Sequence, residues 1–266
     1  MSSSHEARCF VTHEGNPYFN MALDEWLLRQ ALCDPGFVAF RLYTWLPAAI
    51  TIGLNQRADV ALDWRAVGNT VVIRRATGGR AIYHDSSELT YSVVLGEDAT
   101  RRLCSGRSAS RISALIAQGL TRFLAQRGIG AEFVRRSSLL DQRPVAGHTA
   151  PCFASSARHE LVSGGRKVVA SAQRRIGEAV LQHGSIKAGG VAYHAALAGI
   201  GEAEGSDLRL QSIDYEWLMA TACDLFSAIG EVIGIGWKLT EEQTEERVSL
   251  LASQIMSAPL ERRDLH

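Results

Sequence analysis

Residues 159–186 contain three strand-like runs separated by two glycine turns, and this feature constrains the fold most strongly. The stretch reads HELVSGGRKVVASAQRRIGEAVLQHGSI. Gly164 and Gly165 mark the first turn, and Gly177 marks the second. Glycine adopts the positive φ angles that tight hairpin turns require, and runs that follow one another this closely pair as neighbours. The sequence therefore predicts an antiparallel β-meander over these residues.

Further strand-like segments precede the meander, and helical segments lie on both sides. β-branched and aromatic runs predict strands at 37–45, 48–56, 70–75 and 88–96. Apolar residues at helical spacing predict helices at 16–32, 59–68, 107–128, 214–234 and 240–263. Residues 131–151 are polar and irregular, and we expect a flexible loop there. Because the strands come in runs rather than in strict alternation with helices, the predicted class is α+β, with helices bracketing a largely antiparallel sheet.

Length, charge and cysteine content exclude several classes of function. The 266 residues suffice for one large domain, or for one domain with a small appendage. A formal net charge of zero argues against nucleic-acid binding through a strongly basic surface. No run of about 18 apolar residues occurs, so we expect no membrane span. The five cysteines are widely spaced without a C-x-x-C pair, which favours a cytoplasmic protein with free thiols over a disulfide framework or a zinc site.

The stretch RRATGGRAIYHD, residues 74–85, connects two predicted strands and carries an unusual density of functional residue types. It lacks the G-x-x-x-x-G-K-[ST] pattern of a P-loop. Gly78 and Gly79 allow a close approach of the backbone to a ligand, whose carbonyl or phosphate oxygen the turn N–H groups could meet. The plainer alternative is a tight turn with solvated arginines. The charged residues that favour a binding site are Arg74, Arg75, Arg80, His84 and Asp85.

Cys152 is the cysteine whose surroundings best suit a nucleophile. A free cysteine is more often a small buried apolar residue, and Cys223 in MATACDLF is an example of that pattern. Cys152 instead follows a polar loop and precedes the meander, and the glycine turn could fold Lys167 back beside it. A neighbouring ammonium favours the thiolate, which is the reactive form. His183, at the end of a predicted strand, carries little weight by itself.

Six segments together resemble the lipoate and biotin protein ligase superfamily. They are YFNMALDEWLL, ITIGLNQ, RRATGGRAIYHD, ELTYSVV, GRKVVASAQRR and LQHGSI, in the family's order, and they cover most of residues 16–190. The resemblance implies a mixed, mostly antiparallel sheet flanked by helices, similar to the catalytic core of class II aminoacyl-tRNA synthetases. It also suggests a catalytic domain over residues 1–238 and a helical tail over residues 239–266.

Within this superfamily the motifs are closest to the octanoyltransferase branch. Lipoate ligases use ATP and usually carry three glycines where this chain has Gly78-Gly79-Arg80. Octanoyltransferases need no ATP, and one branch has TGGRA together with a nucleophilic cysteine in an ACF-like motif. Here the corresponding motif is PCF, which makes Cys152 the expected nucleophile. Lys167 falls on that branch's lysine in GRK, which lowers the thiol pKa, and Arg80 would crowd the path of an adenylate phosphate.

The resemblance implies a donor, an acceptor and a set of site residues. The donor would be octanoyl-acyl carrier protein, and the acceptor a lipoyl domain of the glycine-cleavage H protein or of a 2-oxoacid dehydrogenase E2 subunit. No cofactor, metal, nucleic acid or membrane is expected. Two alternatives remain open, an ATP-dependent lipoate ligase and a non-catalytic acyl-binding protein on the same scaffold. The expected substrate-binding residues are Arg74, Gly78, Gly79, Arg80, His84, Ser171, Gln173, His183 and Gly184.

Overall fold

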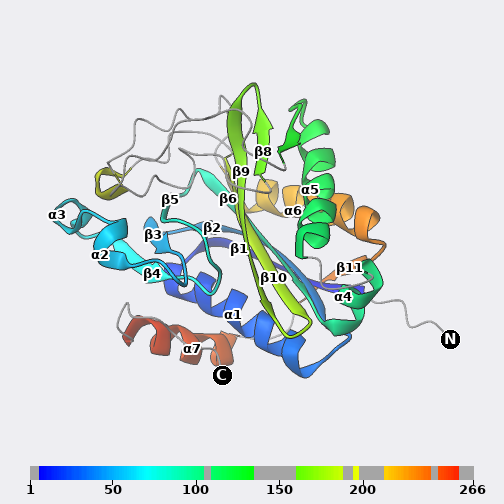
Figure 1. Cartoon of the computed structure of the whole chain (residues 1–266), viewed down its shortest axis with the longest axis horizontal. Helices are drawn as coiled ribbons and strands as arrows, with labels where there is room; N and C mark the ends of the chain where they lie inside the picture. The colour runs from blue at the N-terminus through cyan, green and yellow to red at the C-terminus, as the bar shows by residue number, and fades with distance from the viewer. Residues whose placement is uncertain are drawn as a thin grey trace.

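The computed structural model describes residues 6–104, 109–134, 160–187, 194–197, 213–240 and 245–257. Figure 1 shows a large twisted sheet with helices packed on both sides and a small sheet at one end. Cys152 and most of the predicted loop at 131–151 lie outside the described residues. No helix in the described part of the chain is long and apolar enough to cross a membrane.

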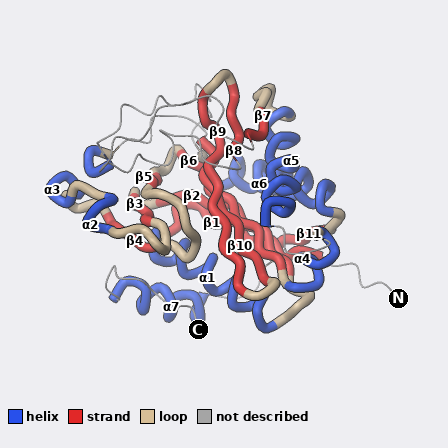
Figure 2. Tube along the Cα trace, viewed as in Figure 1, coloured by secondary structure: helices blue, strands red, loops and turns tan. Residues whose placement is uncertain are grey.

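The larger sheet forms the centre of the molecule. Its described strands are β1 (Glu6–Gly15), β2 (Val38–Trp45), β6 (Glu88–Leu95), β7 (Glu132–Val134), β8 (Glu160–Ser163), β9 (Arg166–Ile176), β10 (Ala179–Lys187) and β11 (Gly236–Leu239). Their order across the sheet is β11-β1-β2-β6-β10-β9-β8-β7. β1 pairs in parallel with β2 and β11, and the other neighbours pair antiparallel, which confirms the mixed, mostly antiparallel sheet. Figure 2 shows the strands in red.

The predicted meander is confirmed as strands β8, β9 and β10. The turns contain Gly164, Gly165 and Gly177, with φ angles of 56°, 78° and 57°. β10 pairs with β9 on one side and with β6 on the other, so it lies inside the sheet and all of its residues are buried. Side chains of β10 therefore reach the layers on both faces of the sheet without contact with bulk water.

A smaller sheet contains parts of the RRATGGRAIYHD stretch, residues 74–85. It consists of β4 (Val71–Arg74), β3 (Ala49–Ile52) and β5 (Ile82–His84), in the order β4-β3-β5. Two short helices lie between β3 and β4 in the chain, α2 (Ala58–Ala61) and α3 (Trp64–Val67), where the sequence predicted one helix over 59–68. The helix is interrupted because the Asp63 carboxylate accepts a hydrogen bond from the Arg65 N–H and starts a new helix.

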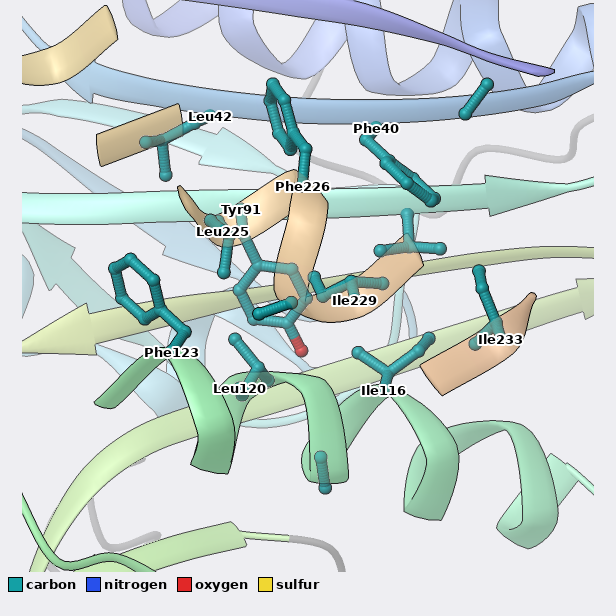
Figure 3. Close-up of a cluster of buried hydrophobic side chains, with 14 of the residues drawn as sticks. Phe40, Leu42, Tyr91, Ile116, Leu120, Phe123, Leu225, Phe226, Ile229 and Ile233 are labelled. Atoms are coloured by element: carbon teal, nitrogen blue, oxygen red, sulfur yellow. The ribbon is translucent and has the colours of Figure 1, made fainter. Parts of the chain in front are cut away.

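Helices α5 (Ala109–Ala125) and α6 (Tyr215–Ile233) cover one face of the larger sheet. Figure 3 shows their apolar side chains, Ile116, Leu120 and Phe226 among them, packed against residues of the sheet such as Phe40. The short helix α4 (Glu97–Leu103) follows β6, and a 3-10 turn, η1, lies at Ala195–Leu197. Alternate side chains of the central strands point to this α5 and α6 face, and the remaining side chains point to the opposite face.

Helices α1 (Pro17–Cys33) and α7 (Glu245–Ser257) lie on the opposite face of the sheet (Figure 1). The predicted start of α1 is confirmed, since the Asn16 side chain accepts a hydrogen bond from the Tyr18 N–H and Pro17 occupies the first turn. The predicted apolar face was incomplete, because Asn20 and Asp24 are buried. α7 packs on the outer side of α1 and leaves little of it exposed. The domain boundary at residue 238 stays a prediction.

The sequence did not predict three of these strands. β1 and β11 lie at one edge of the sheet and pair with each other in parallel. β7 lies within the segment expected to be a loop and pairs antiparallel with β8. β7 and β11 have three and four residues, too few for strand periodicity to be read, and each pairs with one neighbouring strand at an end of the sheet, β8 and β1 respectively.

Candidate active site

A cavity of about 180 Å³ lies between the small sheet, the larger sheet and helix α1. Six of the nine predicted substrate-binding residues line it, although they come from segments about a hundred residues apart in the sequence. These residues are Gly79, Arg80, His84, Ser171, His183 and Gly184. The apolar walls are formed by the buried side chains of Met21, Tyr43 and Trp45, none of which was predicted from the sequence as a site residue.

Other predicted residues lie away from the cavity wall. Arg74 is buried and donates hydrogen bonds to the carbonyl oxygens of Gly53, Leu54 and Gln56 at 2.7–3.1 Å. Gln173 donates to Ser113 Oγ at 3.2 Å, so its side chain points to the α5 face of the sheet. The structure thus gives both residues structural contacts, and their part in substrate binding stays a prediction.

Ser171 borders the cavity, but its hydroxyl is directed to the α5 and α6 face. Ser171 Oγ lies 2.8 Å from the hydroxyl of Tyr91, which belongs to the core on that face. The reason is strand alternation: Ala170 and Ala172 pair with Ser185 and His183 of β10, so these four side chains share the cavity face. Ser171 and Gln173 then point the other way. A substrate contact from Ser171 would come from its backbone.

The side chain of Arg75 fixes the loop that contains Gly78 and Gly79, called the glycine loop below. Its guanidinium donates to the carbonyl oxygens of Gly78 at 2.7 Å and Arg80 at 2.8 Å, and to Thr51 Oγ1 at 3.1 Å. Gly79 has a φ of 94°, and a side chain on Gly53 would come within 2.0 Å of the Gly79 carbonyl oxygen. Glycine is therefore required on both sides of this close approach, which brings the loop against the β3 strand end.

His183 connects this loop to helix α1. Its Nδ1 lies 2.8 Å from Asp24 Oδ2, and its Nε2 lies 2.5 Å from Thr77 Oγ1. Since the carboxylate can only accept, Nδ1 carries the proton and Nε2 accepts from the Thr77 hydroxyl. Burial of Asp24 opposes its ionisation, but the hydrogen bond from His183 and the charge of Arg41 outweigh burial and lower the Asp24 pKa. The imidazole is thereby fixed in one tautomer at the cavity wall.

His84 has the same arrangement on the other side of the cavity. Its Nδ1 lies 2.6 Å from Glu88 Oε1, its Nε2 lies 2.8 Å from Thr51 Oγ1, and its ring stacks on Trp45 with centroids 4.1 Å apart. Burial lowers the pKa of His84, which keeps the ring neutral at neutral pH, although Glu88 opposes this shift. The Glu88 carboxylate can only accept, so the single proton of the neutral ring lies on Nδ1, and Nε2 accepts from the Thr51 hydroxyl.

Glu88 stays ionised at the centre of this second network. Although burial favours the neutral acid, His84 and Lys187 together lower the pKa of Glu88 to about 2. Lys187 Nζ lies 2.5 Å from Glu88 Oε2, and Thr90 Oγ1 donates to Glu88 Oε1 at 2.8 Å. Breaking a buried pair of this kind is strongly destabilising, because it leaves one uncompensated charge in the interior.

Lys167, one of the two predicted catalytic residues, lies at the edge of the cavity. Its ammonium pairs at 2.7 Å with Glu160 Oε1, and Glu160 itself lines the cavity. The second predicted catalytic residue, Cys152, precedes Glu160 by eight positions and lies outside the described residues. Within the described residues no group of three or more His, Cys, Asp or Glu side chains is placed to hold a metal ion.

The carboxylates that orient the two histidines were not among the residues predicted from the sequence. Asp24 lies in the apolar face of a helix, one turn from Met21 and from Leu27, and a lone acid at such a position is a signal of a buried partner. Glu88 lies four residues after His84 at the start of a strand, where no periodicity marks it. Ser185, in the LQHGSI segment, was not singled out either.

Comparison with known proteins finds relatives that are named as octanoyltransferases. The chain is 39% identical over 181 residues to Octanoyltransferase LipM of Macrococcus caseolyticus, covering 66% of this chain and 63% of that protein. It is 40% identical over 187 residues to Octanoyltransferase LipM of Brevibacillus brevis, covering 67% of this chain and 64% of that protein. The chain thus spans a little under two thirds of the length of these relatives.

Solved structures and a family model complete the comparison. Lipoate-protein ligase A bound with ATP superposes with a TM-score of 0.68 at 18% identity, covering 94% of this chain and 93% of that one. A bi-partite lipoate protein ligase from Thermoplasma acidophilum, studied with its E2 lipoyl domain, gives 0.68 at 17% identity, covering 98% and 99%. These likenesses confirm the fold. The model for the lipoyl protein ligase A/B catalytic domain matches residues 16–195, more than half of the chain, and the protein belongs to that family.

Proposed function

We propose that this chain is an octanoyltransferase, which moves an octanoyl group from acyl carrier protein to the acceptor lysine of a lipoyl domain. The observation that carries the proposal is the cavity, which is apolar inside and joins residues of the RRATGGRAIYHD, GRKVVASAQRR and LQHGSI segments. The octanoyltransferase relatives, which match about two thirds of this chain, support it. Transfer without ATP also agrees with Arg80, which stands where the ligases carry a glycine.

The cavity suits a linear acyl chain. Met21, Tyr43 and Trp45 are buried and form its inner walls, whereas Gly79 is exposed and Arg80 half-buried at its mouth. Each methylene removed from water contributes roughly 0.8 kcal/mol, so burial of the alkyl chain of an octanoyl group contributes several kcal/mol of binding free energy here. The ring nitrogens of the two histidines already have carboxylate and threonine partners, so the acyl chain would contact mainly the apolar walls.

The chemistry proposed is two successive acyl transfers. The Cys152 thiolate attacks the carbonyl carbon of the octanoyl thioester, a new C–S bond forms, and the carrier's phosphopantetheine thiolate leaves and takes up a proton. The amine of the acceptor lysine then attacks the acyl-enzyme, the Cys152 thiolate leaves, and the amine loses a proton. The first step exchanges one thioester for another and is nearly balanced. The second converts a thioester into an amide and drives the cycle.

Lys167 is proposed to favour the thiolate of Cys152, since a nearby ammonium lowers a thiol pKa. His84 and His183 are proposed to position the glycine loop and the acyl chain. Each Nε2 atom lies within hydrogen-bond distance of a threonine hydroxyl, so both rings are held in place in the free protein. The acceptor proposed is a lipoyl domain of the glycine-cleavage H protein or of a 2-oxoacid dehydrogenase E2 subunit, and we expect the enzyme in the cytoplasm.

Intact mass spectrometry after mixing with octanoyl-acyl carrier protein tests the proposal. We expect one octanoyl adduct that hydroxylamine removes, none on Cys152→Ala, and normal adduct formation on Cys33→Ala. Cys33 is an exposed cysteine at the end of α1 and controls for non-specific thiol acylation. An adduct of equal yield on Cys152→Ala would refute the assignment of the nucleophile.

A second assay separates the transferase from the two alternatives. The wild-type protein should not exchange pyrophosphate into ATP when lipoate or octanoate is supplied, whereas an ATP-dependent ligase would. Transfer of octanoyl from the carrier to an isolated lipoyl domain, followed by the mass of that domain, separates a transferase from a non-catalytic acyl-binding protein. Lipoate-dependent pyrophosphate exchange without octanoyl transfer would establish the ligase instead.

A further inference from the structure

The side-chain hydroxyl of Ser185 is buried in the cavity wall and has no hydrogen-bond partner within the described residues. The residue is 2% exposed, it lines the cavity, and its Oγ is isolated from water. Buried hydroxyl groups in native proteins are almost always hydrogen-bonded, so an isolated one inside a ligand cavity calls for an explanation. Ser185 lies in the LQHGSI segment, but its missing hydrogen-bond partner is seen only in the structure.

The neighbours of Ser185 already have partners of their own. On β10 its side chain shares the cavity face with His183 and Lys187, which pair with Asp24 and Glu88 respectively. Its cross-strand neighbour on β6 is Thr90, whose hydroxyl donates to Glu88 and accepts from the indole N–H of Trp45. Its neighbour on β9 is Ala170, which has no polar side chain. Within the described residues, Ser185 is therefore a donor without a partner beside groups that already have one.

The chemistry of the expected ligand identifies a partner for this donor. An alkyl chain cannot accept a hydrogen bond, so Ser185 beside methylene groups would remain unsatisfied. A carbonyl oxygen can accept one, and the acyl group has a single carbonyl, at the end where the chain is transferred. Ser185 lies on the same sheet end as Glu160, because Ala170 pairs with Ser185 and Glu160 belongs to the strand next to β9. Glu160 in turn pairs with Lys167.

We propose that Ser185 is a catalytic residue that donates a hydrogen bond to the carbonyl oxygen of the bound acyl group. This inference rests on the proposed function and adds a donor to it. When sulfur attacks the carbonyl carbon, the carbonyl π electrons move to the oxygen, and the Ser185 O–H bonds more strongly to the resulting oxyanion. The oxyanion electrons then return, the other C–S bond breaks, and the proton stays on Ser185 throughout.

Replacement of Ser185 should separate catalysis from stability. Ser185→Ala should lower kcat for octanoyl transfer about 100- to 1000-fold with little change in KM, in the range seen when one oxyanion donor is removed. Because the hydroxyl has no partner in the free protein, the same variant should have an unchanged or higher Tm. Ser185→Thr, which keeps the hydroxyl, should recover most of the rate. The control is Thr100→Val on α4, which removes another buried hydroxyl without a described partner and should change neither quantity.

A binding experiment tests the contact without turnover. In a Cys152→Ala background, calorimetry compares S-octanoyl-pantetheine with S-octyl-pantetheine, in which a methylene replaces the carbonyl. Adding Ser185→Ala should weaken the octanoyl compound about 3- to 10-fold and leave the octyl compound unchanged. Equal effects on both compounds, an unchanged kcat, or a fall in Tm that accounts for the lost rate would overturn the inference. Failure of the wild type to transfer octanoyl would instead reject the proposed function. The binding comparison would still test the hydrogen bond between Ser185 and the acyl carbonyl.

Discussion

Lys167 Nζ lies 2.7 Å from Glu160 Oε1, and both side chains are almost completely buried, at 5% and 3% exposure. The ammonium proposed to activate Cys152 is thus neutralised in part by a carboxylate that borders the cavity. A buried pair of this kind has two consequences. Each partner depends on the other for its stability in the interior, and the field that reaches a neighbouring thiol depends on both charges.

Changing Glu160 should therefore move the pKa of the Cys152 thiol. We expect Glu160→Gln to lower that pKa, because Lys167 then acts without a counter-charge, and Lys167→Met/Glu160→Gln to raise it relative to the single variant. The pH dependence of iodoacetamide alkylation at Cys152, located by peptide mass spectrometry, measures both values. Identical alkylation profiles in the three proteins would remove Lys167 from the activation of Cys152.

Arg80 should contribute to binding of the donor and not of the acceptor. Arg80 lies at the mouth of the cavity, where its guanidinium can meet the phosphopantetheine phosphate or the acidic surface of a carrier protein. A charge-assisted hydrogen bond contributes roughly 1.5–3 kcal/mol, so Arg80→Ala should raise KM for octanoyl-carrier about 10- to 100-fold. Steady-state kinetics with each substrate varied in turn gives the two KM values. Arg65→Ala, an exposed arginine on α3, is the control, and a similar rise there would show that the effect is general electrostatics.

The two adjacent glycines of the loop should respond differently to alanine. At Gly79 a Cβ would lie 2.7 Å from Arg75 Nη2, and the φ of 94° is unfavourable for any L-residue, whereas nothing lies within 4 Å of a Cβ on Gly78. Gly79→Ala should destabilise the protein by about 1–3 kcal/mol, and Gly78→Ala by less than about 0.5 kcal/mol. Urea unfolding of the two variants measures the difference. Comparable losses at both positions would contradict the loop geometry described here.

Stability should fall in acid because of Glu88. Its pKa in the folded protein is about 2, against an ordinary value of 4.5, so its contribution is complete above pH 4.5 and is lost as the pH falls towards 2. This difference corresponds to about 3 kcal/mol. Glu88→Gln/Lys187→Met removes both charges and should flatten the decline in unfolding free energy between pH 4.5 and 3, measured by urea unfolding. Glu97→Gln, which removes a partly exposed pair with Arg101, should leave the slope as in the wild type.

The sequence by itself determined the class of fold and named six of the residues that line the cavity. The glycine turns at 164–165 and 177 and the apolar runs around them are local signals, and they predicted the β-meander that carries His183 and Gly184. The motif resemblance then identified six residues that line one cavity. The first inference depends on residues close together in the sequence, for which turn chemistry and strand propensity are sufficient. The second depends on the resemblance of several short motifs to a family.

Only the tertiary structure decided which face each side chain serves and which partner it finds. Ser171 and Ser185 are both small hydroxyl residues on neighbouring strands, but the register of β9 against β10 directs Ser171 to Tyr91 and Ser185 into the cavity. Asp24 and His183 are 159 residues apart and meet because α1 packs beneath β10. Pairing of this kind follows from long-range packing and from the need to compensate buried charge, and no local pattern in the sequence records either.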